Sequence, residues 1–241
     1  MKTLEVVALT DSVPEKHLRR GQVGNMSPPP VPDLHAILAR LSSRRPVFHS
    51  EADFQHALAW ELQQHDHAAN IRLEKRISKD GPHVHLDLLV QSNSHELAIE
   101  LKYKTRAVKL AHADEQYDLL NQHAQDIGRH DFIKDIRRLE DYVQDHPGSI
   151  GYAILLTNDR TYWSESRKTD AVDSAFRLHE GRVLQGEVTW GSKAAAGTKH
   201  RRETPIALRG KYTLSWKDYS SHGETHDKQF RYVMVRVPSD C

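Results

Sequence analysis

The segment from His83 to Thr105, with the sequence HVHLDLLVQSNSHELAIELKYKT, constrains the fold more than any other part of the chain. It contains two short apolar-rich runs, His83–Val90 and Glu96–Tyr103, in which side chains of different character alternate. A period of two in such runs is typical of β-strands. The polar residues 91–94 between the runs have the composition of a turn. The segment therefore predicts an antiparallel hairpin.

Three charged side chains of this hairpin are expected to lie together. Asp87 is on the first run, and Glu100 and Lys102 are two positions apart on the second, so these two share a face. Mg²⁺ takes oxygen ligands and usually needs only one or two protein carboxylates besides substrate phosphate. A nearby lysine can position the attacking water or offset charge in the transition state. The trio therefore indicates metal-dependent chemistry on phosphate esters, and a solvated sheet face with an incidental Glu–Lys pair is the alternative.

Asp87 followed by Glu100-Leu101-Lys102 resembles the motif of the PD-(D/E)XK nuclease superfamily, which has the restriction-endonuclease-like fold. The resemblance extends from Phe48 to Asn158, and Leu86 stands where the motif often has proline. It implies metal-dependent hydrolysis of phosphodiester bonds but does not by itself fix the substrate. We expect a deoxyribonuclease of the endonuclease type, acting on DNA in restriction, defence or repair. In that role Asp87 and Glu100 bind Mg²⁺ or Mn²⁺, and Lys102 is catalytic.

The superfamily often has a further acidic residue on the helix before the core strands. Ser50 is a good N-cap and predicts a helix that reaches about Gln64. Glu61 lies on the apolar stripe of this helix, where a carboxylate is expensive unless it is paired or bound to a metal. We expect Glu61 to be the additional catalytic and metal-binding carboxylate. Glu51, at the start of the same helix, is the accessory alternative.

Other residues near the hairpin are expected to assist. Several branches of the superfamily have a glutamine on the helix after the second hairpin strand, and Gln125 or Gln122 would fill this position. His85 would border the metal site. Basic residues close to the site are expected to bind the phosphates of DNA. The predicted DNA-binding residues are Lys104, Arg106, Lys109 and Arg129.

Patterns along the remaining chain predict an α/β fold with a mixed central sheet flanked by helices. Asp33 begins a helix that reaches Ser42, residues 71–77 alternate as a first strand, and residues 113–144 have a helical pattern. The apolar run Ile150–Thr157 is typical of a buried strand. The C-terminal part predicts an added β-rich layer. Its expected elements are a short helix at Ala171–Leu178 and strands at Val183–Trp190, Ile206–Trp216 and Phe230–Val237.

Three regions follow from these patterns. Residues 1–32 are expected to form an N-terminal arm that ends in a proline-rich linker. Residues 33–160 would form the nuclease core, and residues 161–241 a C-terminal β-rich extension packed on that core.

The composition narrows the class of protein. The formal net charge is only +1, so nucleic-acid binding has to depend on local basic patches. The single cysteine, Cys241, excludes a disulfide framework and favours a cytoplasmic setting. No apolar run is long enough for a signal peptide or a membrane helix, so we expect no membrane association. A homodimer would suit the cleavage of both DNA strands.

Two other functions are compatible with the same residues. His83, His85 and Asp87 faintly resemble the H-x-H-x-D motif of metallo-β-lactamase-like hydrolases, which would make the protein a His/Asp metal hydrolase, although Leu88 stands where that motif has another histidine. The other alternative is a non-catalytic module of nuclease fold that binds nucleic acid or a protein. Binding alone, however, does not require the trio of Asp87, Glu100 and Lys102.

Overall fold

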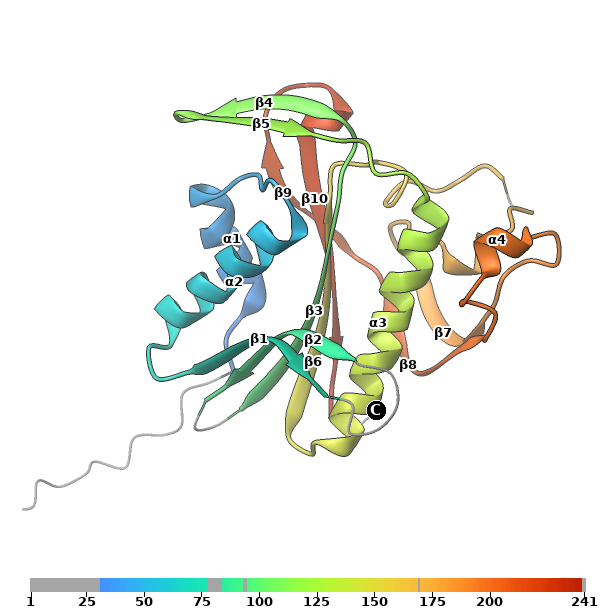
Figure 1. The fold of residues 1–241 in the computed structure, drawn as a ribbon, viewed down its shortest axis with the longest axis horizontal. Helices are drawn as coiled ribbons and strands as arrows, with labels where there is room; N and C mark the ends of the chain where they lie inside the picture. Colours follow the sequence, from blue (N-terminus) through green and yellow to red (C-terminus); the bar gives the residue numbers. More distant parts are fainter. Residues whose placement is uncertain (1–30, 78–83, 93–94, 169, 240–241) are drawn as a thin grey trace, which may run out of the picture.

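The computed structural model describes residues 31–77, 84–92, 95–168 and 170–239. The predicted N-terminal arm lies outside the described residues as far as residue 30. A six-stranded mixed sheet forms the centre of the molecule (Figure 1). Across this sheet the strands are β1 (Asn70–Arg76), β2 (His85–Gln91), β3 (Glu96–Lys104), β6 (Ser149–Thr157), β10 (Gln229–Val237) and β9 (Trp216–Ser221). The pair β3–β6 is parallel, and the other neighbours are antiparallel. The expected hairpin and the expected buried strand are thus confirmed.

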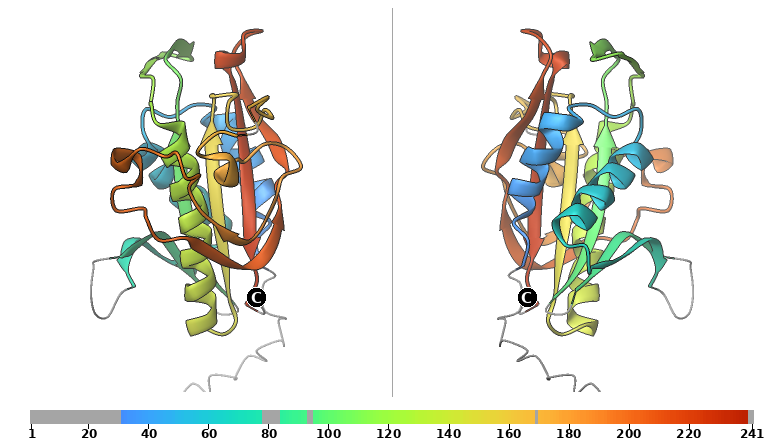
Figure 2. Two further views of the ribbon diagram at one scale, coloured as in Figure 1. Left: turned by 90° about the vertical axis from the view of Figure 1, so that its right-hand side faces the viewer. Right: turned by 90° about the vertical axis from the view of Figure 1, so that its left-hand side faces the viewer.

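Helices cover both faces of this sheet, as Figures 1 and 2 show. Helices α1 (Leu34–Arg44) and α2 (Glu51–His65) lie on one face, and α3 (Gln125–Asp145) lies on the other. Asp33 caps α1 by accepting a hydrogen bond from the His35 amide, and Ser50 caps α2 by accepting one from the Asp53 amide. Both predicted helix starts are therefore confirmed.

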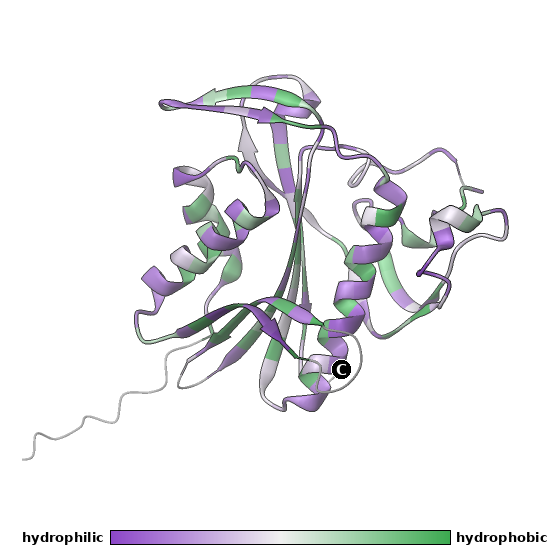
Figure 3. Cartoon of the chain, in the orientation of Figure 1, coloured by the Kyte–Doolittle hydropathy of each residue, from purple (hydrophilic) through white to green (hydrophobic). Residues whose placement is uncertain are grey.

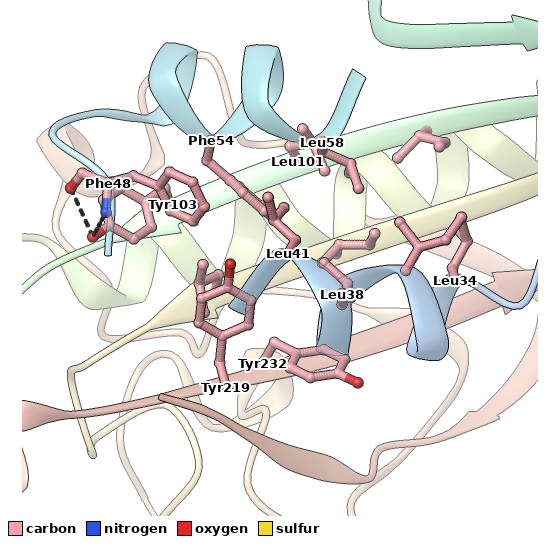
Figure 4. Packing of buried hydrophobic residues seen from close by; sticks show 14 of the residues in the cluster. Leu34, Leu38, Leu41, Phe48, Phe54, Leu58, Leu101, Tyr103, Tyr219 and Tyr232 are labelled. Atoms are coloured by element: carbon pink, nitrogen blue, oxygen red, sulfur yellow. Dashed lines mark hydrogen bonds between the residues drawn. The ribbon is translucent and has the colours of Figure 1, made fainter. Parts of the chain in front are cut away.

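Alternation along β3 divides its side chains between the two faces. Leu97, Ile99, Leu101 and Tyr103 are buried in the core beneath α1 and α2. Figure 4 shows part of this core, in which aromatic and leucine side chains interlock. Ala98 belongs to the second core, on the side of α3. The same alternation carries the polar residues at positions 100 and 102 to the α3 side of the sheet.

The helix predicted over residues 113–144 is wrong in its first part. Its first residues instead form β5 (Glu115–Leu119), which pairs with the preceding strand β4 (Val108–His112) in a two-stranded ribbon, and α3 begins only at Gln125. Buried and exposed residues alternate along both strands, and Figure 3 shows hydrophobic residues interspersed with hydrophilic ones along the ribbon. Ala113 has a φ of 51° at the turn, which interrupts a continuous helix.

The C-terminal part does not form the single added β-rich layer that was predicted. Only β7 (Val183–Val188) and β8 (Ile206–Thr213) form a separate ribbon, whereas β9 and β10 extend the central sheet next to β6. The single strand expected over residues 206–216 is therefore two strands in different sheets. Shorter elements complete this part: the 3₁₀ helices Ser174–Phe176 and His226–Lys228, and the helix α4 (Ala196–Lys199). Among the described residues, no helix has the length and apolar character needed to span a bilayer.

Candidate functional site

The candidate site lies where β2 and β3 separate. Their ladder ends at the pair Leu88–Ile99, so the β3 amides beyond it lack a partner on β2. Carboxylates replace that partner. The Leu101 amide donates to Asp87 Oδ2 at 2.6 Å, and the Tyr103 amide donates to Glu51 Oε2 at 2.7 Å. Asp87 and Glu51 are thereby fixed along the edge of β3, at residues on either side of Lys102.

Charged residues of α3 meet the same part of β3 from the other side. Lys102 Nζ lies 2.7 Å from Asp135 Oδ2, and Arg138 Nη1 lies 2.7 Å from Glu100 Oε1. Arg138 also contacts Asp135 Oδ1 at 3.2 Å, which joins the two ion pairs. Glu100 is only 2% exposed. The β3 residues of the motif are thus held in a largely buried network with α3.

Negative charge exceeds positive charge in this cluster. It holds four carboxylates (Glu51, Asp87, Glu100 and Asp135) and two cations (Lys102 and Arg138), a formal excess of two negative charges. Burial raises the pKa of Asp87 to about 6, although the Leu101 amide and Lys102 oppose the rise. Burial and the carboxylate of Asp135 likewise raise the pKa of Glu100. A divalent cation would offset this excess.

The pKa of Lys102 is also raised, but for a lysine a raised pKa favours the charged form. Burial alone would lower the pKa of its ammonium, but the carboxylates of Asp135, Glu51 and Asp87 outweigh this effect and raise the pKa above its usual value. Lys102 is therefore a protonated hydrogen-bond donor at neutral pH.

Asp135 and Arg138 are not among the residues predicted from the sequence, because the polar residues considered on this helix ended at Asp131. Asp135 follows Phe132 by three residues and precedes Leu139 by four, and both of these side chains are fully buried. A carboxylate on such a stripe needs a partner, so the spacing itself indicated a buried ion pair. Which cation would pair with it depended on how α3 packs on the sheet.

The assignment of Glu61 to the site is wrong. Glu61 is 3% exposed, and its carboxylate pairs with Arg40 at 3.1 Å and with Arg44 at 3.4 Å, both on α1. Its position ten residues after Glu51 corresponds to about 15 Å along a helix. The cost of burying this carboxylate is thus offset by arginines, and Glu51 is the carboxylate of α2 that reaches the site.

The proposed accessory residues also differ from expectation. Gln125 Nε2 donates to Asp159 Oδ2 at 3.0 Å, at the end of β6, and not to the carboxylates of the site. His85 is exposed at the start of β2, and His83 lies outside the described residues. Gln55 of α2 does reach the site, because its side chain donates to the Asp87 carbonyl at 2.7 Å. No sequence signal distinguished it from other polar residues of α2.

The four predicted DNA-binding residues lie in different surroundings. Lys104 is half-buried at the end of β3, and Arg106 lines a pocket of about 500 Å³ at the ends of β3 and β6. Lys109 is exposed on β4. Arg129 is 4% exposed and donates to Asp173 and to a backbone carbonyl. Arg129 cannot contact DNA from this position, so its assignment is wrong.

The donor atoms of the site fit a hard cation. Asp87 and Glu100 each use one oxygen in a bond to the protein, and the second oxygen is in no hydrogen bond within the part of the chain that is described. Over residues 31–239, outside the gaps named above, no group of three or more His, Cys, Asp and Glu side chains is arranged to hold a metal ion. A Mg²⁺ ion bound by one or two carboxylates, water and substrate phosphate does not require such a group.

Comparison with family models, with curated proteins and with solved structures gives no match to this chain.

Proposed function

We propose that the protein is a Mg²⁺- or Mn²⁺-dependent deoxyribonuclease of the PD-(D/E)XK type, with a restriction-endonuclease-like core. The observation that supports this most strongly is the hydrogen bond from the Leu101 amide to Asp87. Leu101 separates Glu100 from Lys102, so this bond brings the Asp of one strand to the Glu-x-Lys of the next. The helix carboxylate of Glu51 is fixed two residues further along β3.

Each residue has a role that follows from its contacts. Asp87 and Glu100 would hold the metal through their free oxygens, with Glu51 beside them. The metal, when bound, supplies positive charge to the phosphate and makes water a stronger nucleophile. Lys102 stays protonated, so it orients water and stabilises negative charge by donating hydrogen bonds rather than by removing a proton. Arg138 positions Glu100 by pairing with it.

A non-catalytic module that binds nucleic acid is the second candidate. The ion pairs Lys102–Asp135 and Glu100–Arg138 favour it, since both motif residues have structural partners without any metal or substrate. In that case substitution of Lys102 would lower stability and would have no cleavage activity to affect. The effect of this substitution on cleavage therefore distinguishes the nuclease from the binding module.

The substrate is identified by incubating the protein with supercoiled plasmid, linear duplex, single-stranded DNA and RNA. We expect cleavage of DNA in Mg²⁺ or Mn²⁺ and none in EDTA, because the carboxylates alone cannot offset charge on the phosphate. Product ends on a sequencing gel would separate endonuclease from exonuclease activity. Metal-independent binding without any cleavage would instead support the binding module.

The two glutamates of α2 provide a matched pair of variants. Glu51→Gln keeps an oxygen that can accept from the Tyr103 amide but removes the charge next to Lys102, so we expect cleavage to fall roughly tenfold or more. Glu61→Gln should leave the cleavage rate unchanged and lower the free energy of unfolding, since Arg40 and Arg44 lose their counterion. The reverse pattern, with cleavage sensitive to Glu61 and not to Glu51, would contradict the site described here.

A further inference from the structure

An open groove of about 510 Å³ leads away from Lys102 along α3. We call it the α3 groove. One wall is α3 and the other is the turn that follows α4, which lies beside the middle of α3 in Figures 1 and 2. The lining residues are Lys102, Asp131, Lys134, Asp135, Arg138, His200, Arg201 and Arg202.

The α3 groove is strongly basic in a chain of nearly zero net charge. Five lysines and arginines and two acids line it, a formal charge of +3 with histidine neutral, although Lys102 and Arg138 also face the carboxylates of the site. Both acids, Asp131 and Asp135, already form ion pairs with other side chains. Neither of them pairs with Lys134 or Arg201 among the described residues, and both of these cations are exposed.

The basic surface continues beyond the α3 groove. A second hollow of about 420 Å³ shares Lys134, Arg201 and Arg202 with it and adds Arg137, and no acid is among its lining residues. The turn that bears Arg201 is anchored to the body of the protein. Arg202 Nε lies 3.3 Å from Asp131 Oδ1, and the Trp190 indole donates to the Arg202 carbonyl at 3.1 Å. The two hollows are thus joined through Lys134, Arg201 and Arg202, and Lys102 lines the first of them.

We propose that the α3 groove binds the backbone phosphates of the DNA strand next to the cleaved bond, with Lys134 and Arg201 as the phosphate ligands. This inference rests on the proposed nuclease function and gives the C-terminal part of the chain a role in that function. Lys134 and Arg201, which neither acid of the groove compensates, can bind phosphates without reading sequence. The turn after α4 therefore supplies affinity and orientation, while β2, β3 and α3 supply the chemistry.

The test removes the two phosphate ligands together and measures binding in EDTA, where no cleavage occurs. Lys134→Gln and Arg201→Asn are combined, because Arg201 has a φ of 63° and asparagine tolerates this region. Affinity for a fluorescein-labelled DNA duplex is measured by anisotropy over a range of salt concentrations. The matched control combines Lys217→Gln and Arg236→Asn, two exposed cations of β9 and β10.

We expect the groove variant to bind roughly tenfold or more weakly at low salt, with a salt slope smaller by about two, since two counterions fewer are released. The control should bind as the unmodified protein does, and thermal unfolding should show that both variants are folded. An equal loss of DNA affinity in both variants, or no DNA binding by the unmodified protein in EDTA, would overturn the proposal that the α3 groove binds DNA. Cleavage in Mg²⁺, measured separately, decides the nuclease function, so the two proposals fail independently.

Discussion

Replacing Lys102 with alanine should reduce metal-dependent DNA cleavage roughly a hundredfold or more, as expected when a donor that acts in the transition state is removed. The expectation depends on the position of the ammonium, which is held 2.7 Å from Asp135 and two residues beyond Glu100, the proposed metal ligand. The rate is measured in single turnovers at saturating DNA, so that weaker binding does not contribute.

Two further variants show whether this loss is chemical. Lys102→Met keeps most of the aliphatic stem of the side chain and should be as inactive as the alanine variant. Lys217→Ala removes an exposed lysine of β9 and should cleave normally. DNA affinity in EDTA should change little in the Lys102 variants. A Lys102 variant that is folded and cleaves at the normal rate would exclude the proposed role of Lys102.

The largest expected effect on stability is at Glu140, which joins α3 to β8. Glu140 is 1% exposed, and its carboxylate accepts from the amides of Arg209 and Gly210 and from the Tyr212 hydroxyl at 2.8–3.0 Å. Glu140→Ala removes the acceptor that these three donors share, and the Tyr212 side chain among them is buried. We expect the free energy of unfolding to fall by about 3–5 kcal/mol, measured by urea denaturation.

The neighbouring residue provides the control for this prediction. Asp141 pairs with Arg137 at 2.6 Å and with Arg209 at 2.8 Å, but its side chain is 54% exposed. Asp141→Ala should therefore cost less than about 1 kcal/mol, as solvent-exposed ion pairs usually do. If the two variants lose the same stability, burial of the Glu140 carboxylate is not what holds β8 on α3.

Local patterns along the chain were sufficient for much of the fold. The period of two in the hairpin, the caps Asp33 and Ser50 and the apolar run of β6 are all short-range signals, and the structure has these elements. The ribbon β4–β5 was missed because Leu119 and Leu120 were assigned to the apolar stripe of the helix that follows. The pairing of β10 with β6 was not foreseen, since no local pattern specifies which sheet a distant strand joins.

Some residues of the candidate site could likewise be predicted from local patterns, and others could not. Asp87, Glu100 and Lys102 could be found because hairpin pairing relates residues close in sequence. The choice between Glu51 and Glu61 could not be made, because both carboxylates lie on the same helix and their partners are on other elements. Glu61 forms ion pairs with Arg40 and Arg44 of α1, whereas Glu51 accepts a hydrogen bond from the Tyr103 amide where β3 has no partner on β2. Only the packing of α1, α2 and β3 together determines this outcome.

We propose that Asp87 takes part in metal-dependent cleavage of DNA. The most direct test compares the unmodified protein with Asp87→Asn on supercoiled plasmid in Mg²⁺ and in EDTA. Asparagine keeps an oxygen that can accept from the Leu101 amide, so the variant should remain folded while losing the negative charge that a metal requires. We predict nicked or linear DNA only from the unmodified protein and only in Mg²⁺. Equal cleavage by the folded Asp87→Asn variant, or cleavage that persists in EDTA, would exclude this role of Asp87.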